Sequence, residues 1–235
     1  KDLTDLDAKT SENVKAEDVT LITGTFAEVN AALVTNALTL LTADNVAATL
    51  SGTVLAANAN TIANATDGKV TATIAAGEAA VLNGALTNAV ATDALTLTVN
   101  NAAGTAAAAT VLNALDGKTS VKVKVDAAAV TGDYADLETL YVINKANFAN
   151  LGNEAVTFIG TTTAARVDSI LKATTGVVTA SVTASAASDL VANLKNAKND
   201  ALTLTVNGAS EKASDLNTLD GKTSKAVIID ALTTS

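Results

Sequence analysis

Short runs of alternating apolar and polar residues recur along the whole chain. Each run is rich in Val, Ile, Leu and Thr and is bounded by Gly, Asn or Asp, which is the pattern expected of short β-strands. The predicted strands are 14–17, 48–51, 70–74, 95–99, 121–125, 156–159, 178–182, 202–206 and 226–229.

Between these runs, apolar residues recur at the three- and four-residue spacing of an α-helix. The groups that predict helices are Phe26/Val29/Leu33, Val81/Leu82/Leu86, Val111/Leu112/Leu115, Tyr134/Leu137/Tyr141, Val167/Ile170/Leu171 and Leu190/Leu194. Segments 25–44 and 133–153 are predicted to hold the longest helices. Gly68, Gly117, Gly176 and Gly221 are predicted to take the left-handed conformation that ends many helices. Strand and helix therefore alternate with a period of about 25 residues.

The chain is built by repetition. Leu-Asp-Gly-Lys-Thr-Ser stands at 115–120 and at 219–224, and a degraded copy, Leu-Asp-Ala-Lys-Thr-Ser, stands at 6–11. Residues 24–30 align with 132–138 at an offset of 108 (132 minus 24). The offset holds without a gap until it becomes one residue smaller near Asp93, whose counterpart is Asp200. We predict two long repeats of about 105–108 residues, 11–119 and 120–223. Residues 1–10 would end a preceding repeat and 224–235 would open a further one, as expected of a part of a longer chain.

Composition favours a thin, layered core. Only 2% of the residues are aromatic, and Ala, Val, Leu and Thr supply most of the apolar material. We therefore predict an α/β fold, a right-handed parallel α/β solenoid of about nine strand–helix coils, each packing mainly on its neighbours. The rival prediction is two compact α/β domains in tandem, one for each long repeat.

Charge and residue usage exclude several classes of function. A net charge of −9 argues against nucleic acid and anionic lipid as partners, because both need clustered Lys and Arg. No apolar run is long enough to span a membrane. The chain has no His and no Cys, which removes the usual zinc ligands and Ser-His-Asp or Cys-His catalysis. No cofactor is predicted, although Asp and Asn at the turns leave calcium open.

Two repeated motifs raise hypotheses about catalysis. Gly117-Lys118-Thr119 resembles the end of a phosphate-binding loop, but Leu112 stands where that loop needs Gly, so a helix cap is the favoured interpretation. Ser–Lys dyads could form from Lys118/Ser120 or Lys222/Ser224, and Asp126 and Asp230 could act as paired carboxylates. These residues recur from repeat to repeat, which favours a structural role.

Hydroxyl residues alternate with apolar residues in four of the predicted strands. This alternation places them on one face of the strands, where they could form a flat array suited to an ordered surface or a glycan. Lys122 and Lys124 interrupt the array, and Thr is also common on ordinary exposed strands. The predicted surface-binding residues are Thr71, Thr73, Thr96, Thr98, Thr179, Ser181, Thr203 and Thr205.

The phrases ITGTFAEVNAAL, LSGTVLAANANTIANATDGKVTATI, DALTLTVN and SDLNTLDGKTS resemble the long tandem repeats of very large surface or secreted proteins of cyanobacteria. The resemblance covers nearly the whole chain. It implies a structural, adhesive or cell-envelope component, and it transfers no catalytic residue. The acidic composition, free of Cys and rich in Ala, Thr and Val, is similar to that of surface-layer proteins.

We therefore expect a non-enzymatic structural segment of an extracellular repeat array, either a surface layer, a filament or an adhesin stalk. The expected partners are further copies or further repeats of itself, with a glycan or the cell envelope as a second candidate. The alternative function is a surface- or glycan-binding module that uses the threonine-rich face. A hydrolase with paired carboxylates comes third, and no catalytic, cofactor-binding or metal-binding residue is predicted.

Overall fold

The computed structural model describes residues 2–36, 40–42 and 44–230. The chain divides into two compact units. Unit 1 comprises Lys1–Asn100, Ala114–Val125 and Asn147–Ala149, and unit 2 comprises Asn101–Asn113, Asp126–Ala146 and Asn150–Ser235. The boundaries of the two long repeats remain a prediction.

Strands and short helices alternate throughout unit 1. Its elements are α1 (Asp2–Asp7), β1 (Val14–Ala16), β2 (Leu21–Gly24), α2 (Phe26–Asn30), the π-helical turn η1 (Ala31–Thr35), β3 (Leu40–Thr42), β4 (Ala47–Val54), α3 (Ala56–Ala63), β5 (Val70–Ile74), α4 (Ala79–Ala85), β6 (Ala94–Thr96), β7 (Thr98–Val99), β9 (Val123–Val125) and β11 (Phe148–Ala149). The helix α5 (Ala109–Asp116) and the 3-10 turn η3 (Lys145–Asn147) have residues in both units.

Unit 2 contains a similar series of elements. They are β8 (Ala107–Ala108), β10 (Ala129–Gly132), α6 (Tyr134–Glu138), the π-helical turn η2 (Thr139–Ile143), β12 (Ala155–Thr162), α7 (Ala164–Leu171), β13 (Val178–Val182), α8 (Ala187–Asn193), β14 (Ala201–Thr203), β15 (Thr205–Val206), α9 (Ala213–Asp220) and β16 (Ile228–Ile229). From β2 to α4, each element has a later counterpart at the offset found in the sequence, as β2 ends at Gly24 and β10 ends at Gly132. The offset is one smaller at β6, whose counterpart is β14, because the one-residue slip lies before it.

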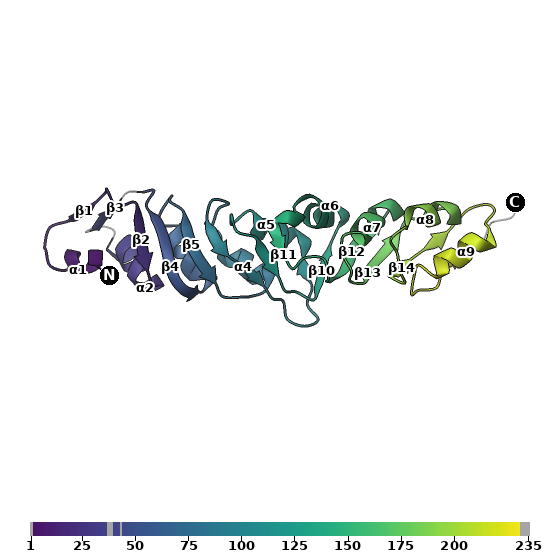
Figure 1. Cartoon of the computed structure of the whole chain (residues 1–235), viewed down its shortest axis with the longest axis horizontal. Helices are drawn as coiled ribbons and strands as arrows, with labels where there is room; N and C mark the ends of the chain where they lie inside the picture. Colours follow the sequence, from purple (N-terminus) through teal and green to yellow (C-terminus); the bar gives the residue numbers. More distant parts are fainter. Residues whose placement is uncertain (1, 37–39, 43, 231–235) are drawn as a thin grey trace. The chain divides into compact units, whose positions relative to one another are not determined.

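All strand pairs between the described strands are parallel. In unit 1 the strand orders are β2-β4-β5-β6, β7-β9-β11 and β1-β3; in unit 2 they are β8-β10-β12-β13-β14 and β15-β16. Neighbours in a sheet follow the order of the chain, and helices lie between them in sequence, as for β12, β13 and β14 with α7 and α8 (Figure 1). None of these sheets closes on itself. The predicted α/β class, with parallel strands alternating with helices, is confirmed.

The strands form because their inward residues are apolar and their outward residues are polar. In β5 the side chains of Val70, Ala72 and Ile74 are buried, while those of Thr71 and Thr73 face outward. The predicted bounds 70–74 and 178–182 match the observed β5 and β13. Predicted strands 95–99 and 202–206 are each divided into two strands, at the fully buried Leu97 and Leu204.

Five strands and three α-helices, α1, α3 and α9, were not among the predicted elements. The strands β2, β3, β8, β10 and β11 have at most four residues, so their alternation is too brief to detect. The helices α3 and α9 have few large apolar residues, and Ala56 and Ala59 fill much of the buried side of α3. Small side chains give a weak apolar pattern in the sequence but still fit closely between neighbouring layers.

Among the described residues, segments 25–44 and 133–153 hold the longest continuous helical runs, as predicted; these runs cover 26–35 and 134–143, where α2 and α6 continue into π-helical turns. One further sequence prediction needs revision. The four glycines are not left-handed caps: among the described glycines, positive φ occurs at Gly52, Gly104, Gly152 and Gly160. Gly68 and Gly176 are needed for another reason. A Cβ at either position would collide with backbone of the preceding strand segment, at Val46 and Glu154 respectively.

Within the described part of the chain, no helix is long and apolar enough to cross a membrane.

Candidate functional site

The predicted threonine face lies on the outward side of the strands. All eight predicted residues are half-buried or exposed, and the residues that alternate with them are buried. Strand pairing then decides which hydroxyls are neighbours. In unit 1, Thr73 lies beside Thr96; in unit 2, Ser181 lies beside Thr203. A binding role for this face remains a prediction.

The pairing register extends the face into two rows in each unit. The rows of unit 1 are Thr23–Thr49–Thr71 and Thr53–Thr73–Thr96. The rows of unit 2 are Thr131–Thr157–Thr179 and Thr161–Ser181–Thr203. Six of these residues are not among the predicted ones, namely Thr23, Thr49, Thr53, Thr131, Thr157 and Thr161. The long repeat indicates that these six residues occupy matching positions in the two repeats. It does not indicate that they lie on strands beside Thr71 or Thr179.

A bulge in the longest strand of each unit brings the second row into register. Pairing between β4 and β5 shifts between Thr49 and Thr53, and pairing between β12 and β13 shifts between Thr157 and Thr161. Gly52 and Gly160 lie in these bulges with φ of 75° and 80°. Such positive φ values are accessible to glycine at little cost, so these two glycines allow the chain to skip residues and still align a second Thr.

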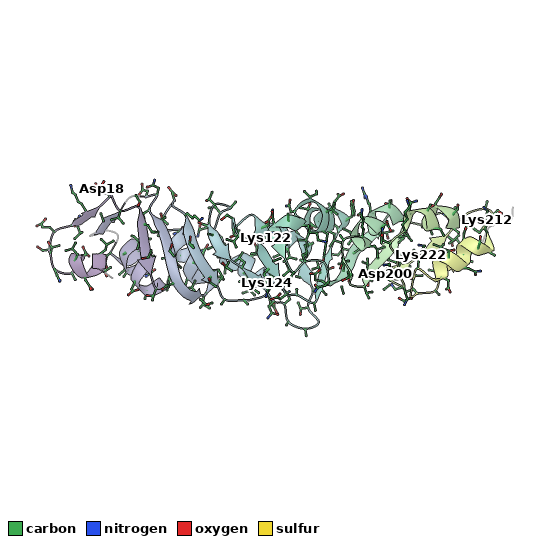
Figure 2. All side chains as sticks on the ribbon, viewed as in Figure 1. Asp18, Lys122, Lys124, Asp200, Lys212 and Lys222 are labelled. Carbon is green, nitrogen blue, oxygen red and sulfur yellow. The ribbon has the colours of Figure 1, made fainter. Side chains whose placement is uncertain are left out.

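Thr98 and Thr205 do not belong to the rows. They lie on β7 and β15, which pair with β9 and β16 in separate sheets, so Thr98 is opposite Lys124 and Thr205 is opposite Ile228. Lys122 and Lys124 lie on the same segment of unit 1 (Figure 2). Of the eight predicted surface-binding residues, six therefore lie in the rows and two do not. The two are separated from the rows because the predicted strands 95–99 and 202–206 break at Leu97 and Leu204.

The repeated motif Leu-Asp-Gly-Lys-Thr-Ser joins one strand–helix turn to the preceding one. Lys118 Nζ donates to the carbonyl oxygen of Leu86 at 2.6 Å, and Lys222 Nζ donates to that of Leu194 at 2.6 Å. Leu86 and Leu194 are the C-terminal cap residues of α4 and α8. Each Lys therefore neutralises the carbonyl end of the previous helix, whereas its own helix was the expected partner. Lys222 lies at the C-terminal part of unit 2, together with Asp200 (Figure 2).

The Thr of the same motif is buried. Thr119 Oγ1 donates to Leu95 O at 2.8 Å and accepts from Leu95 N and Val121 N, both at 3.0 Å. Thr66, Thr174 and Thr223 make similar links to a preceding strand segment. Each of the four stands three residues after the last residue of a helix, at 63, 116, 171 or 220. These hydroxyls satisfy backbone groups that lie out of reach of water.

Two buried aspartates also accept hydrogen bonds from backbone N–H groups. Asp93 Oδ1 accepts from Val70 N at 2.8 Å and its Oδ2 accepts from Val90 N at 3.0 Å. Asp200 accepts in the same way from Val178 N and Lys198 N, both at 2.9 Å. The turn before Asp200 is one residue shorter, and Asn199 there has a φ of 62°. The left-handed Asn thus accommodates the one-residue slip without loss of the two hydrogen bonds.

Unit 2 also buries a phenol against a carboxylate. Tyr141 and Glu154 are 1% and 2% exposed, and Tyr141 Oη donates to Glu154 Oε2 at 3.0 Å. Glu154 also accepts from Gly152 N. Burial first, and then the charge and hydrogen bond of Glu154, raise the pKa of Tyr141 far above its ordinary value. The phenol therefore remains protonated and serves as a hydrogen-bond donor.

Most of the residues with possible catalytic roles make structural hydrogen bonds. Ser120 Oγ donates to Asp93 O at 2.8 Å, while the neighbouring Lys118 reaches Leu86, so the structure describes no bond between the two. Asp126 Oδ1 accepts from Asn150 Nδ2 at 2.8 Å. Asp230 is exposed. Over the described ranges, acidic side chains do not gather in threes at a point that could hold a metal ion.

Two shallow hollows lie in unit 2. One, of about 200 Å³, lies between 163–165, 183–185 and the start of α8; the other, of about 220 Å³, lies near Thr174 and Asp200. Both are smaller than the roughly 300–1,000 Å³ of typical small-molecule sites. The threonine face is therefore the more extensive candidate surface.

No family model, curated protein or solved structure matches this chain.

Proposed function

We propose that this protein is a non-enzymatic structural segment of an extracellular repeat array, forming a surface layer, a filament or the stalk of an adhesin. One observation carries the proposal: the residues that recur in the repeated motif are used to join successive strand–helix turns. Lys118, Thr119 and Ser120 all bond to backbone of an earlier turn, and Lys222, Thr223 and Ser224 do the same. A motif repeated for chemistry would present its polar groups to a ligand.

The finer architecture in this proposal is a right-handed parallel solenoid. Leu21 pairs with Ala47, and Thr53 pairs with Thr73, so the chain between two paired residues forms one strand–helix turn. In both units the next turn adds its strand beside the last. Parallel connections of this kind are right-handed in nearly all known sheets. A stack of such turns grows by nearest-neighbour contacts, which suits a long structural array.

Electron microscopy of the purified chain tests the proposal. We expect regular filaments or sheets, or isolated rods of one chain if the protein is a stalk. Two separate compact particles per chain would contradict the solenoid, and the structural array with it. Repeating the preparation with a calcium chelator tests the remaining cofactor prediction, because loss of order on chelation would identify calcium as a component of the array.

A second function is favoured by the threonine rows. Strands in a sheet lie about 4.7–4.9 Å apart, so each row presents hydroxyls at a regular spacing to an ordered surface or a glycan. The row through Thr53, Thr73 and Thr96 is an exposed one. Replacing Thr73 and Thr96 by Lys should abolish retention on an ordered polysaccharide such as chitin or cellulose if the rows bind it. Thr61→Lys on α3, another exposed Thr, is the matched control, and equal retention of all variants would reject this function.

A further inference from the structure

The hollow beside the starts of α7 and α8 is lined by polar side chains that have no polar counterpart in the first repeat. It has a volume of about 200 Å³. Its polar lining residues are Thr163, Thr183, Ser185, Asp189 and Asn193. The residues at an offset of 108 (189 minus 81) in the first repeat are Leu55, Ala75, Gly77, Val81 and Ala85. All five positions therefore change from apolar or glycine to polar between the two repeats.

The backbone does not require polar residues at these positions. The helix α8 begins and ends 108 residues after α4 (187 minus 79), and Gly77 and Ser185 make equivalent bridges to the next turn of the chain. In the first repeat the side chains of Leu55 and Val81 are both 63% exposed, so apolar residues are tolerated at the surface here. The same local fold forms with either set of residues, which leaves the polar set free to serve a ligand.

Hydrogen bonds orient the polar groups of the hollow. Ser185 Oγ donates to Asp189 Oδ2 at 3.2 Å, which fixes the position of the carboxylate. Asn193 Nδ2 donates to the backbone carbonyl oxygen of Asp189 at 2.8 Å, which fixes the orientation of the Asn193 amide. The first repeat has Gly, Val and Ala at these three positions, so the whole arrangement is absent from it. A site oriented by its own hydrogen bonds loses less conformational freedom when a ligand binds.

Three groups in the hollow keep hydrogen-bonding capacity. Asp189 Oδ1 and Asn193 Oδ1 accept no hydrogen bond from the described residues. Thr163 is the N-cap residue of α7, but its hydroxyl makes no capping hydrogen bond. Carboxylate and amide oxygens accept hydrogen bonds, and a hydroxyl can accept or donate. The hollow therefore favours a ligand that presents several hydrogen-bond donors along one edge.

The geometry points to a binding site for one uncharged sugar residue, whose hydroxyls donate to Asp189 and Asn193. The apolar part of the lining, which faces the C–H groups of the ring, is Ala164, Ala165, Ala184 and Leu190. The volume is below the roughly 300–1,000 Å³ of sites for larger ligands, so it suits a single ring and not an oligosaccharide. The carboxylate repels anionic sugars. This site goes beyond the proposed structural function, and no residue of the threonine rows lines it.

A titration followed by NMR tests the site. The probes are the methyl glycosides of glucose, galactose and mannose, added one at a time to the isotope-labelled whole chain. We expect at least one of them to shift the backbone amide signals of residues 163–165 and 183–193 in a saturable way. The expected Kd is on the order of 1 mM, because a shallow site gains only a few net hydrogen bonds.

Variants that install first-repeat residues test the side chains. Asp189→Val/Asn193→Ala should weaken binding about tenfold or more, because it removes a charge-assisted hydrogen bond and its neighbour. Ser188→Ala is the matched control: it lies on the same helix outside the lining, and it also installs the first-repeat residue, Ala80. This control should bind like the wild type.

The reverse exchange tests whether the five residues are sufficient. A variant of the first repeat that receives the polar set should gain a second site, with a Kd within about tenfold of the original one. Its substitutions are Leu55→Thr, Ala75→Thr, Gly77→Ser, Val81→Asp and Ala85→Asn. Thermal denaturation checks that this variant is folded. A folded variant that binds no glycoside would overturn the assignment of the site to these five residues.

Three other results would overturn the inference. The first is the absence of localised shifts with all three glycosides at concentrations up to about 100 mM. The second is binding that Asp189→Val/Asn193→Ala leaves unchanged. The third is a response of the same amide signals to ethylammonium chloride but to none of the glycosides, which would identify a site for organic cations. None of these results bears on the structural array, because no residue of the repeated Leu-Asp-Gly-Lys-Thr-Ser motif lines the hollow.

Discussion

The two long repeats have the same order of elements but differ at one interior site. In the second repeat the site holds Tyr141 and Glu154; in the first repeat Leu33 and Val46 occupy the matching positions, and all four are buried. The strands and helices around the two sites correspond one to one. The comparison shows that the repeated pattern of inward apolar residues is sufficient for this backbone. The buried hydrogen bond is a local addition that the fold tolerates because the phenol and the carboxylate are partners of each other.

The largest expected effect comes from breaking the polar version of the site. Glu154→Ala leaves the Tyr141 hydroxyl and the Gly152 N–H without their acceptor. Because the hydroxyl is buried, we expect the free energy of unfolding to fall by about 2–3 kcal/mol in urea denaturation. Glu154→Gln, which keeps one acceptor oxygen, should lose less. A loss below about 1 kcal/mol for Glu154→Ala would mean that the pair adds little to stability.

Alkaline pH should distinguish the two versions of the site. Burial, followed by Glu154, raises the pKa of Tyr141 in the folded chain. Below pH about 10 both folded and unfolded chains keep this proton and its stabilising contribution is complete; above it only the unfolded chain loses the proton, so stability falls by about 1.4 kcal/mol per pH unit. The double variant Tyr141→Leu/Glu154→Val should lack this component of the pH dependence. Equal slopes for the two proteins between pH 10 and 11 would contradict the assignment.

Replacing the buried Thr should cost the same in both repeats. Thr66 and Thr174 are counterparts, and they donate to the carbonyl oxygens of Val46 and Glu154 at 2.5 and 3.0 Å. Thr66→Val and Thr174→Val each remove this bond and the one accepted from a glycine N–H, so each should lose about 1–2 kcal/mol of unfolding free energy. Thr73→Val on the exposed face is the control and should change stability by less than about 0.5 kcal/mol. A large difference between the two buried sites would show that the repeats are not energetically equivalent.

Converting the second repeat to the chemistry of the first should nearly restore stability. The double variant Tyr141→Leu/Glu154→Val removes the phenol and the carboxylate together, so only the N–H of the half-buried Gly152 loses its acceptor. We expect it to lie within about 1 kcal/mol of the wild type, since apolar replacement of a buried polar pair is often close to neutral. Thermal and urea denaturation, compared with Glu154→Ala, measure the recovery. A double variant as unstable as Glu154→Ala would show that the site cannot repack.

The smallest expected effect concerns an aromatic contact that the first repeat lacks. The Arg166 guanidinium lies 4.7 Å from the centre of the Tyr134 ring, whereas the counterparts are Asn58 and Phe26. Arg166 is exposed, so Arg166→Ala should lower the free energy of unfolding by only about 0.5–1 kcal/mol. Asn58→Ala is the matched change in the first repeat and should have a smaller effect. A double-mutant cycle with Tyr134→Leu isolates the contact, and a coupling near zero would rule it out.

Periodicity predicted the elements best where alternation was long and uninterrupted. The bounds of β5 and β13 follow directly from five residues of strict alternation in each. The same pattern over 95–99 conceals a break, because Leu97 is buried like its neighbours Leu95 and Val99 while the two halves of the run pair in different sheets. The alternation of apolar and polar residues along a strand predicts which way each side chain faces. It does not predict which strand lies alongside.

The candidate face was predicted only in part for the same reason. Thr71 and Thr73 were identified from their own strand, but their neighbours depend on strand pairing, and the pairing of Thr53 with Thr73 also depends on the bulge at Gly52. Likewise, Gly68 was predicted to be a left-handed cap, yet the reason for glycine is the closeness of the backbone at Val46, in the preceding turn of the chain. The pairing of the Thr residues and the close backbone approach at Gly68 both arise from contacts between successive turns of the chain, which the pattern within one strand does not show.

The alternation of strands and helices, the long repetition and the buried side of each strand could be predicted from the order of the residues, because each is a pattern along the chain. The strand register, the break at Leu97 and the partners of the repeated Lys, Thr and Asp depend on the tertiary structure. Those partners lie in an earlier turn of the chain, as when Lys118 reaches Leu86. A hydrogen bond needs both its donor and its acceptor in place, and only the packing of successive turns brings them together.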